Sequence, residues 1–237
     1  MLWTVKIAPR VAALGLLLVP TPARAADVTG EVTLPRQEAK DPDEARAPRG
    51  FTRRRENQTN AISPYDPRPE CFVFLDGPAD DEATRPTAAV LGLSRTRFAP
   101  PVFPVVAGSS VDIQNTSKKT HAVFVRGRDG LWGGDAIGAG RKRSGKAGGA
   151  YEVLELGASG APHLTGRIVP LPTRYFATLG KNGEFAITDV PEGNFTLRIW
   201  YRDGWLATTR RVDVGSRATK TSVVLPVLLK TEPPKNK

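Results

Sequence analysis

The chain has 237 residues, with 34 Lys and Arg against 24 Asp and Glu, which gives a formal net charge of +10. Its single cysteine excludes a disulfide within the chain, so stability must come from an apolar core, for which the length is sufficient. Net charge bears on partners rather than on fold. The basic clusters lack interleaved aromatic residues, which argues against nucleic acid as a partner.

Residues 1–25 have the organisation of a secretory signal peptide. Lys6 and Arg10 precede an apolar core at residues 11–19 that is too short to span a bilayer, and Ala23-Arg24-Ala25 fits the cleavage pattern. Removal of this segment, with its three basic residues and no acidic one, takes the net charge from +10 to +7. No later run suggests a membrane span, so we predict a periplasmic or extracellular protein.

A first strand and a long polar segment follow. Residues 26–34 alternate between apolar and polar, which indicates a strand, and we expect it to pair with the C-terminal lobe. Residues 35–70 are charged and nearly free of aliphatic side chains, so we predict a long polar loop that is partly disordered. The basic run Arg53, Arg54 and Arg55 in this loop is a candidate docking patch.

The segment at residues 71–75 is apolar on both faces, which favours a central strand with Cys71 as a small buried residue. Residues 88–98 indicate another strand, and Gly92 marks a bulge within it. Val111 to Asn115 then alternate as a half-buried strand, before a polar loop that leads to His121.

This last pattern resembles the cupredoxins, in which a strand ends in Asn just before a loop that delivers a copper-ligating His. The corresponding residues here are Asn115 and His121. In particular the chain is similar to cupredoxin-like proteins of the methylamine-utilisation type. The resemblance implies a Greek-key β-sandwich.

A second recognisable segment lies at residues 182–200. A Gly-x-Phe strand at Gly183 is followed by the turn Val190-Pro-Glu-Gly193 and by a strand with alternating Phe195 and Leu197, which together predict a hairpin. The segment resembles the carboxypeptidase-regulatory, or transthyretin-like, domains.

No segment predicts a convincing helix, so we predict an all-β fold in which a cupredoxin-like Greek-key sandwich is combined with a carboxypeptidase-regulatory-like sandwich. We favour two intertwined lobes over one sandwich. The predicted division is a signal peptide at 1–25, a first strand at 26–34, a polar loop at 35–70, a cupredoxin-like lobe at 71–166, a regulatory-like lobe at 167–229 and a polar tail at 230–237.

The cupredoxin resemblance implies a blue-copper centre with two His, one Cys thiolate and a weak axial Met. Counting back from Ile168, the positions of the second-loop Cys, His and Met hold Ala158, Ala161 and Leu164. The candidate ligands that remain are His121 and His163. We therefore predict a degenerate copper site and no bound cofactor, with weak Cu(II) binding by the two imidazoles as the alternative.

Residues 140–147, Gly-Arg-Lys-Arg-Ser-Gly-Lys-Ala, nearly match a phosphate-binding P-loop. Ala147 lacks the hydroxyl that would hold magnesium, and no clear strand precedes the segment, so we interpret it as a flexible basic loop. Its cations Arg141, Lys142 and Arg143, together with Trp132, are candidate interaction residues.

The sequence contains none of the common hydrolase or metalloprotease motifs, and it has two His for acid–base chemistry. We therefore predict no enzymatic activity. The expected function is an exported, non-catalytic accessory module that interacts with an envelope protein or an anionic envelope polymer. The alternatives are a copper-binding or electron-transfer accessory protein with an atypical site, and a carbohydrate- or envelope-polymer-binding module.

Overall fold

The computed structural model describes residues 25–33, 68–128, 132, 136–215, 219–224 and 230–231. The predicted signal peptide and nearly all of the predicted polar loop, including Arg53, Arg54 and Arg55, lie outside the described residues. Within the described part of the chain, no helix has the length and apolar character needed to cross a membrane.

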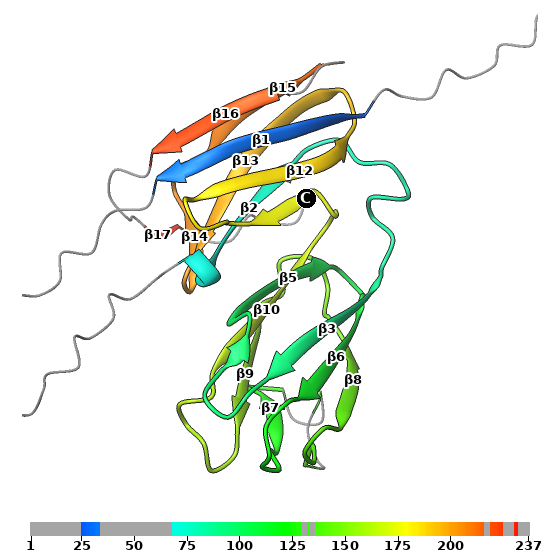
Figure 1. Cartoon of the computed structure of the whole chain (residues 1–237). Coiled ribbons are helices and arrows are strands. Elements are labelled where there is room, and N and C mark those ends of the chain that lie inside the picture. Colours follow the sequence, from blue (N-terminus) through cyan, green and yellow to red (C-terminus); the bar gives the residue numbers. More distant parts are fainter. Residues whose placement is uncertain are drawn as a thin grey trace, which may run out of the picture.

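The regular secondary structure of the described chain is strand apart from one short 3-10 helix, which confirms the predicted all-β sandwich fold (Figure 1). We call the upper part in Figure 1 lobe I and the lower part lobe II. Lobe I contains a 3-10 helix, η2 (Arg68–Glu70), and nine strands, β1 (Ala26–Thr33), β2 (Cys71–Asp76), β11 (Phe176–Thr178), β12 (Glu184–Val190), β13 (Gly193–Tyr201), β14 (Gly204–Leu206), β15 (Arg210–Val214), β16 (Thr219–Val224) and β17 (Lys230–Thr231).

Lobe II contains the eight strands between β2 and β11. They are β3 (Ala88–Leu93), β4 (Phe98–Ala99), β5 (Val102–Val106), β6 (Ser110–Asn115), β7 (Val123–Val125), β8 (Lys142–Lys146), β9 (Leu154–Ala158) and β10 (Gly166–Leu171). The chain thus passes through lobe I, builds lobe II as one continuous segment, and returns to complete lobe I.

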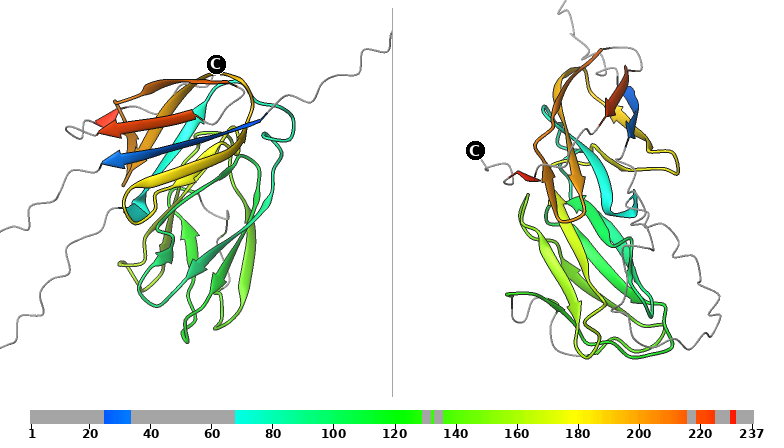
Figure 2. Two further views of the ribbon diagram at one scale, coloured as in Figure 1. Left: turned by 45° about the horizontal axis from the view of Figure 1, so that its top comes forward. Right: turned by 90° about the vertical axis from the view of Figure 1, so that its left-hand side faces the viewer.

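Lobe I is a sandwich of two sheets. The smaller sheet has the strand order β12-β1-β16, and the larger has the order β11-β2-β13-β14-β17, with β15 also paired to β13. The two sheets form separate layers in the right-hand view of Figure 2. Buried side chains from both sheets fill the space between them, including Val28, Ile187, Leu75 and Leu197.

The segment at residues 182–200 joins these two sheets and does not form the predicted hairpin. β12 pairs with β1, whereas β13 pairs with β2, β14 and β15. The chain crosses from one layer to the other at Pro191 and Glu192. Phe185 and Leu197 therefore contact the same core from opposite sheets. The predicted alternation of buried residues is observed, but the two strands do not pair with each other.

Lobe II is also a two-sheet sandwich, with the strand orders β4-β3-β6-β8 and β5-β10-β9-β7. Each sheet contains one parallel pair, β3 with β6 and β5 with β10. Its core includes Leu91, Ile113, Leu154 and Ile168. The predicted strand at residues 88–98 is divided into β3 and β4 by a turn, in which the amide of Ser94 donates to the Arg97 carbonyl at 2.9 Å.

β2 is apolar on both faces because it lies between two cores. Cys71, Val73 and Leu75 face the core of lobe I, whereas Phe72 and Phe74 face an apolar cluster between the lobes. β2 pairs with β13 and β11, although the sequence analysis placed it in the cupredoxin-like lobe. By strand pairing, the chain leaves lobe I only after β2.

Aromatic side chains dominate the contact between the lobes. Phe72 stacks on Trp200 with ring centroids 5.9 Å apart, and Trp200 meets Trp205 edge-on at 5.4 Å. Val169 and Leu171 of β10 pack against this cluster from lobe II. Such a buried, aromatic contact holds the two lobes together by the hydrophobic effect.

Candidate functional site at the lower end of lobe II

Four loops meet at the end of lobe II that points downward in Figure 1. They comprise residues 94–97, 116–122, 136–141 and 159–165. The amide of Thr116 donates to the Leu93 carbonyl at 2.8 Å, which ties the second loop to the end of β3. The amide of Ser159 donates to the Ala122 carbonyl at 2.9 Å, which ties the second loop to the fourth.

Asn115, at the end of β6, organises two of these loops through its buried side chain. Its Nδ2 donates to the carbonyls of Lys119 at 2.7 Å, Ile137 at 2.8 Å and Gly138 at 3.1 Å. Its Oδ1 accepts from the amide and the hydroxyl of Ser117, at 2.9 and 2.8 Å. A buried amide with all its hydrogen-bonding capacity in use fixes the loop conformation.

His121 follows this loop and is 7% exposed. Its backbone forms a two-way bridge with Ile137, and its Nε2 lies 2.9 Å from the Ser117 hydroxyl. That hydroxyl has one proton, for which the Asn115 and Lys119 oxygens at 2.8 and 3.0 Å are acceptors. When the hydroxyl donates to either of these oxygens, it accepts from Nε2–H, and the lone pair of His121 then lies on Nδ1.

His163 lies in the loop between β9 and β10 and is exposed. Its Nε2 is 3.3 Å from the carbonyl oxygen of Arg95, so this ring connects the fourth loop to the first. No hydrogen bond joins the two imidazoles among the described residues. Across the same residues, no group of three or more His, Cys, Asp or Glu side chains is arranged to hold a metal ion.

Apolar side chains occupy the three positions at which the cupredoxin resemblance implies sulfur and imidazole donors. Ala158 is 5% exposed, Leu164 is fully buried in the lobe II core, and Ala161 packs against that core. Backbone hydrogen bonds link Ala161 to Ala158 at 3.1 Å and Leu164 to Ala161 at 2.9 Å. The residues at this end therefore do not fit a blue-copper centre, which requires a thiolate.

Cys71 provides no thiolate for this site. It lies on β2 of lobe I, is 1% exposed, and faces the lobe I core, away from lobe II. Burial raises the pKa of its thiol from 9.0 to about 12, because the charged thiolate is poorly solvated there. The prediction that Cys71 is a small buried residue is confirmed.

Trp132, a candidate interaction residue, is 5% exposed and packs into the lobe II core. Its indole lies against the backbone of Gly145, where a Cβ atom would be 2.3 Å from the ring carbon Cε2. Its Nε1 donates to the Lys146 carbonyl at 3.3 Å. The side chain is thus part of the core, and Gly145 leaves the space that it needs.

The basic segment at residues 140–147 contains strand β8, not the predicted flexible loop. β8 forms the edge of its sheet and pairs with β6. Lys142 forms an ion pair with Asp112 at 2.6 Å, and the Arg143 guanidinium donates to the Trp132 carbonyl at 3.3 Å. Arg141 is exposed in the loop that precedes the strand.

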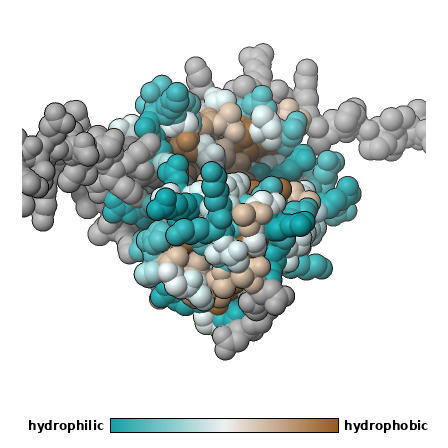
Figure 3. Space-filling view, turned by 60° about the horizontal axis from the view of Figure 1, so that its bottom comes forward, coloured by the Kyte–Doolittle hydropathy of each residue, from teal (hydrophilic) through white to brown (hydrophobic). Residues whose placement is uncertain are grey.

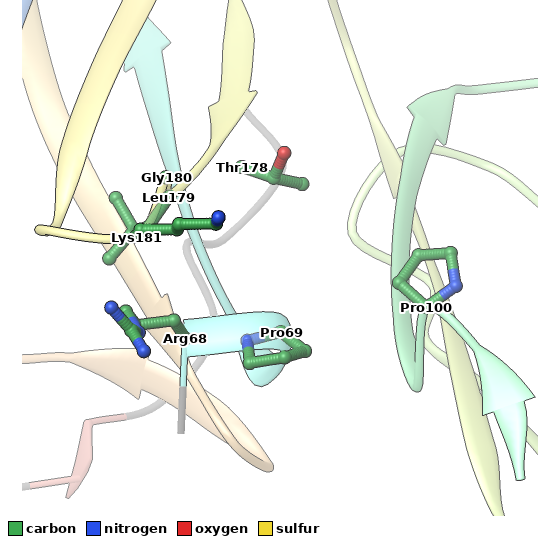
Figure 4. Close-up of a pocket in the computed structure, with 7 residues that line it drawn as sticks. All are labelled: Arg68, Pro69, Pro100, Thr178, Leu179, Gly180 and Lys181. Carbon is green, nitrogen blue, oxygen red and sulfur yellow. The ribbon is translucent and has the colours of Figure 1, made fainter. Parts of the chain in front are cut away.

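The pocket shown in Figure 4 lies between the lobes, away from both histidines. It has a volume of about 380 Å³ and is lined by Arg68, Pro69, Pro100 and residues 178–181. Pro100 of lobe II lies opposite Pro69 of lobe I. The lining combines two cations with no carboxylate, so it lacks a pair of groups for acid–base catalysis.

No protein-family model matches the sequence, and no curated protein is significantly similar to it. Several solved cupredoxin structures are similar to part of the chain. A purple cupredoxin from Nitrosopumilus maritimus is 14% identical, with 35% of this chain and 98% of that chain covered at a TM-score of 0.31. Amicyanin from Paracoccus versutus is 19% identical, with 40% and 85% covered at a TM-score of 0.30.

A reduced amicyanin variant is 18% identical, with 35% of this chain and 81% of that chain covered at a TM-score of 0.31.

Proposed function

We propose that lobe II is a cupredoxin-like scaffold without a blue-copper centre, and that the chain is an exported, non-catalytic accessory module. The observation that carries this proposal is the packing of three apolar residues, Ala158, Ala161 and Leu164, in or against the lobe II core at the implied donor positions. A Cu–thiolate centre needs a deprotonated Cys beside two imidazoles. The one cysteine of the chain is in the core of the other lobe.

The arrangement of the two lobes supports a binding role. We propose that lobe I is a carboxypeptidase-regulatory-like sandwich, since its two layers enclose a continuous core. The apolar cluster around Phe72 and Trp200 joins it to lobe II, so the four loops project from one supported body. Loops on a rigid β-scaffold are common positions for binding residues.

The test is a titration of the mature chain with Cu(II), followed by visible absorption and calorimetry. The proposal predicts no intense thiolate-to-copper absorption at any copper ratio. An intense visible band that saturates at one copper per chain would contradict it, because the structure offers no thiolate to produce that band.

A second candidate function is copper binding through an atypical site, which one feature of His121 favours. Ser117 holds Nε2 of this ring, and Nδ1 has no hydrogen-bond partner among the described residues. Imidazole nitrogen is a suitable ligand for Cu(II), and a hydrogen bond on the opposite nitrogen orients such ligands.

The two functions are separated by comparing His121→Ala with His163→Ala in the same calorimetric titration. Loss of copper binding in the first variant alone favours the atypical site. Equal weak binding by both variants and the unmodified chain shows that neither ring holds the ion.

A further inference from the structure

We propose that the lower end of lobe II binds an acidic polysaccharide, a chain of sugars that carry carboxylate, phosphate or sulfate groups. This inference rests on the proposed function as a binding module and assigns its partner class. The surface consists of five exposed cations, which we call the cationic loop surface: Arg95, Arg97, Lys118, Lys119 and Arg141.

Within the described part of the chain, no carboxylate neutralises the charge on this surface. The described residues of the four loops include no Asp or Glu, and none of the five cations takes part in an ion pair among the described residues. Asp129 and Asp135, which lie between the second and third loops in sequence, are outside the described part of the chain.

Some exposed cations elsewhere in the described chain do have carboxylate partners. Arg126 lies 3.6 Å from Glu155, and Lys142 lies 2.6 Å from Asp112. The concentration of unneutralised cations at one end creates a local positive potential that attracts anions.

The loops that carry these cations are held in place before any ligand arrives. Asn115 fixes the backbone of Lys119 on one side and that of Ile137 and Gly138 on the other. The ring of His163 bonds to the carbonyl of Arg95 and so connects the fourth loop to the first. Preorganisation lowers the entropic cost of binding.

The composition of the surface favours a polysaccharide over other anionic partners. Val90 and Phe124 are the large exposed hydrophobic residues of the described chain, and neither lies in the four loops. Amphipathic segments that lie in a membrane surface insert apolar side chains, protein interfaces are enriched in aromatic anchors, and single-stranded nucleic acids stack on aromatic rings.

The same loops also expose small residues. Ala139, Gly140 and Gly160 are exposed in the third and fourth loops. Figure 3, in which this end is turned toward the viewer, shows hydrophilic residues around a weakly hydrophobic centre. A surface of small side chains leaves charge as the main source of attraction for an extended anionic chain.

The experiment measures binding of the mature chain to dextran sulfate and to neutral dextran, at about 50 and 200 mM salt. We expect binding to dextran sulfate alone, with an affinity that falls steeply with salt as counterions are released. Lys118→Gln/Lys119→Gln should weaken binding by about tenfold or more and reduce the salt dependence. Lys181→Gln/Arg211→Gln, which removes two exposed charges from lobe I, should change it by less than about twofold.

Equal weakening by the two double variants would overturn the proposal, because net charge alone would then explain binding. Tighter binding to vesicles containing phosphatidylglycerol, or to a single-stranded oligonucleotide, would overturn it in favour of those partners. Absence of dextran sulfate binding would reject the proposed polysaccharide binding, but it would not affect the proposal that lobe II lacks a blue-copper centre. A thiolate-to-copper band would reject that second proposal, whether or not dextran sulfate binds.

Discussion

The carboxamide of Asn115 donates a hydrogen bond of 2.8 Å to the carbonyl of Ile137, a residue 22 positions further along the chain. This contact connects the end of β6 to the loop before β8, and it bridges a segment that runs through His121. One buried side chain thus determines how the second and third loops of lobe II are placed relative to each other.

Replacement of Asn115 by Ala should lower the free energy of unfolding by about 2 to 4 kcal/mol, because it removes all the hydrogen bonds of one buried carboxamide, to three carbonyls and from Ser117. Urea denaturation measures this loss. The matched control is Gln114→Ala, which changes the adjacent exposed amide of β6 and should stay within about 0.5 kcal/mol. Similar values for the two variants would show that the Asn115 network adds nothing to stability.

Replacement of Gly145 by Ala should displace the Trp132 indole, since the new methyl carbon would overlap the ring. We expect a loss of about 1 to 3 kcal/mol, as for other additions of volume to a packed core. Gly138→Ala is the control, because a Cβ there is 3.7 Å from its nearest neighbour. An unchanged melting temperature for the Gly145 variant would contradict the close packing of the Trp132 indole against Gly145.

Replacement of Phe72 by Ala should cost about 3 to 5 kcal/mol, because it opens a cavity between the two lobes. Thermal unfolding followed by far-UV circular dichroism measures the loss. Val90→Ala, at a side chain that is 59% exposed, should stay within about 0.5 kcal/mol. A small effect of the Phe72 variant would indicate that the contact between the lobes contributes little to the free energy of unfolding.

The thiol of Cys71 should destabilise the fold at high pH. Its pKa is raised from 9.0 to about 12 in the folded chain, so its contribution is fully present below pH 9 and is lost as the pH rises toward 12. Tyr151, whose pKa is raised from 10.0 to about 12, acts in the same direction from pH 10 upward. The difference between the unmodified chain and Cys71→Ala isolates the thiol.

Urea denaturation at pH 8 and pH 11 measures that difference. The free energy of unfolding should fall less with pH in Cys71→Ala than in the unmodified chain. A parallel fall in both proteins would show that the thiol ionises as easily in the folded state as in the unfolded state.

Restoring the implied donors should create a copper centre in lobe II. The triple variant Ala158→Cys, Ala161→His, Leu164→Met places a thiol, an imidazole and a thioether in the loop that is tied to the strand following His121. We expect an intense visible band with Cu(II), because a thiolate then joins the imidazoles.

Leu164→Met alone provides the control, since it preserves volume and adds no thiolate. It should bind copper no better than the unmodified chain. A triple variant that folds, as judged by circular dichroism, but shows no visible band would contradict the cupredoxin-like description of lobe II.

Alternation of apolar residues predicted the all-β fold, and the continuous apolar run at residues 71–75 predicted the burial of Cys71, because the direction in which a side chain faces is a local property of a strand. Pairing partners are not local, so the alternating Phe185 and Leu197 were assigned to one hairpin although they lie in different sheets. Because β2 is apolar on both faces, it was predicted to be a central strand. Its sequence does not indicate that the face with Phe72 and Phe74 contacts the other lobe.

At the candidate site, the sequence identified Asn115 and His121 but not the five-cation surface, whose members are up to 46 residues apart in the chain. The burial of Trp132 was also missed. Its signal was Gly145, a glycine within a charged segment, because a strand interior seldom keeps glycine unless another group approaches closely.

The position of β1 has a consequence for the order in which the molecule is built. β1 runs antiparallel to β12 and parallel to β16, two strands formed more than 150 residues later in the chain. When the chain emerges from its N-terminus, lobe II can fold first, because its strands are contiguous in the sequence. At that stage β1 still lacks its pairing partners, β12 and β16. Lobe I is therefore the part that a C-terminal truncation would leave open, with β1 exposed along the edge that β16 otherwise covers.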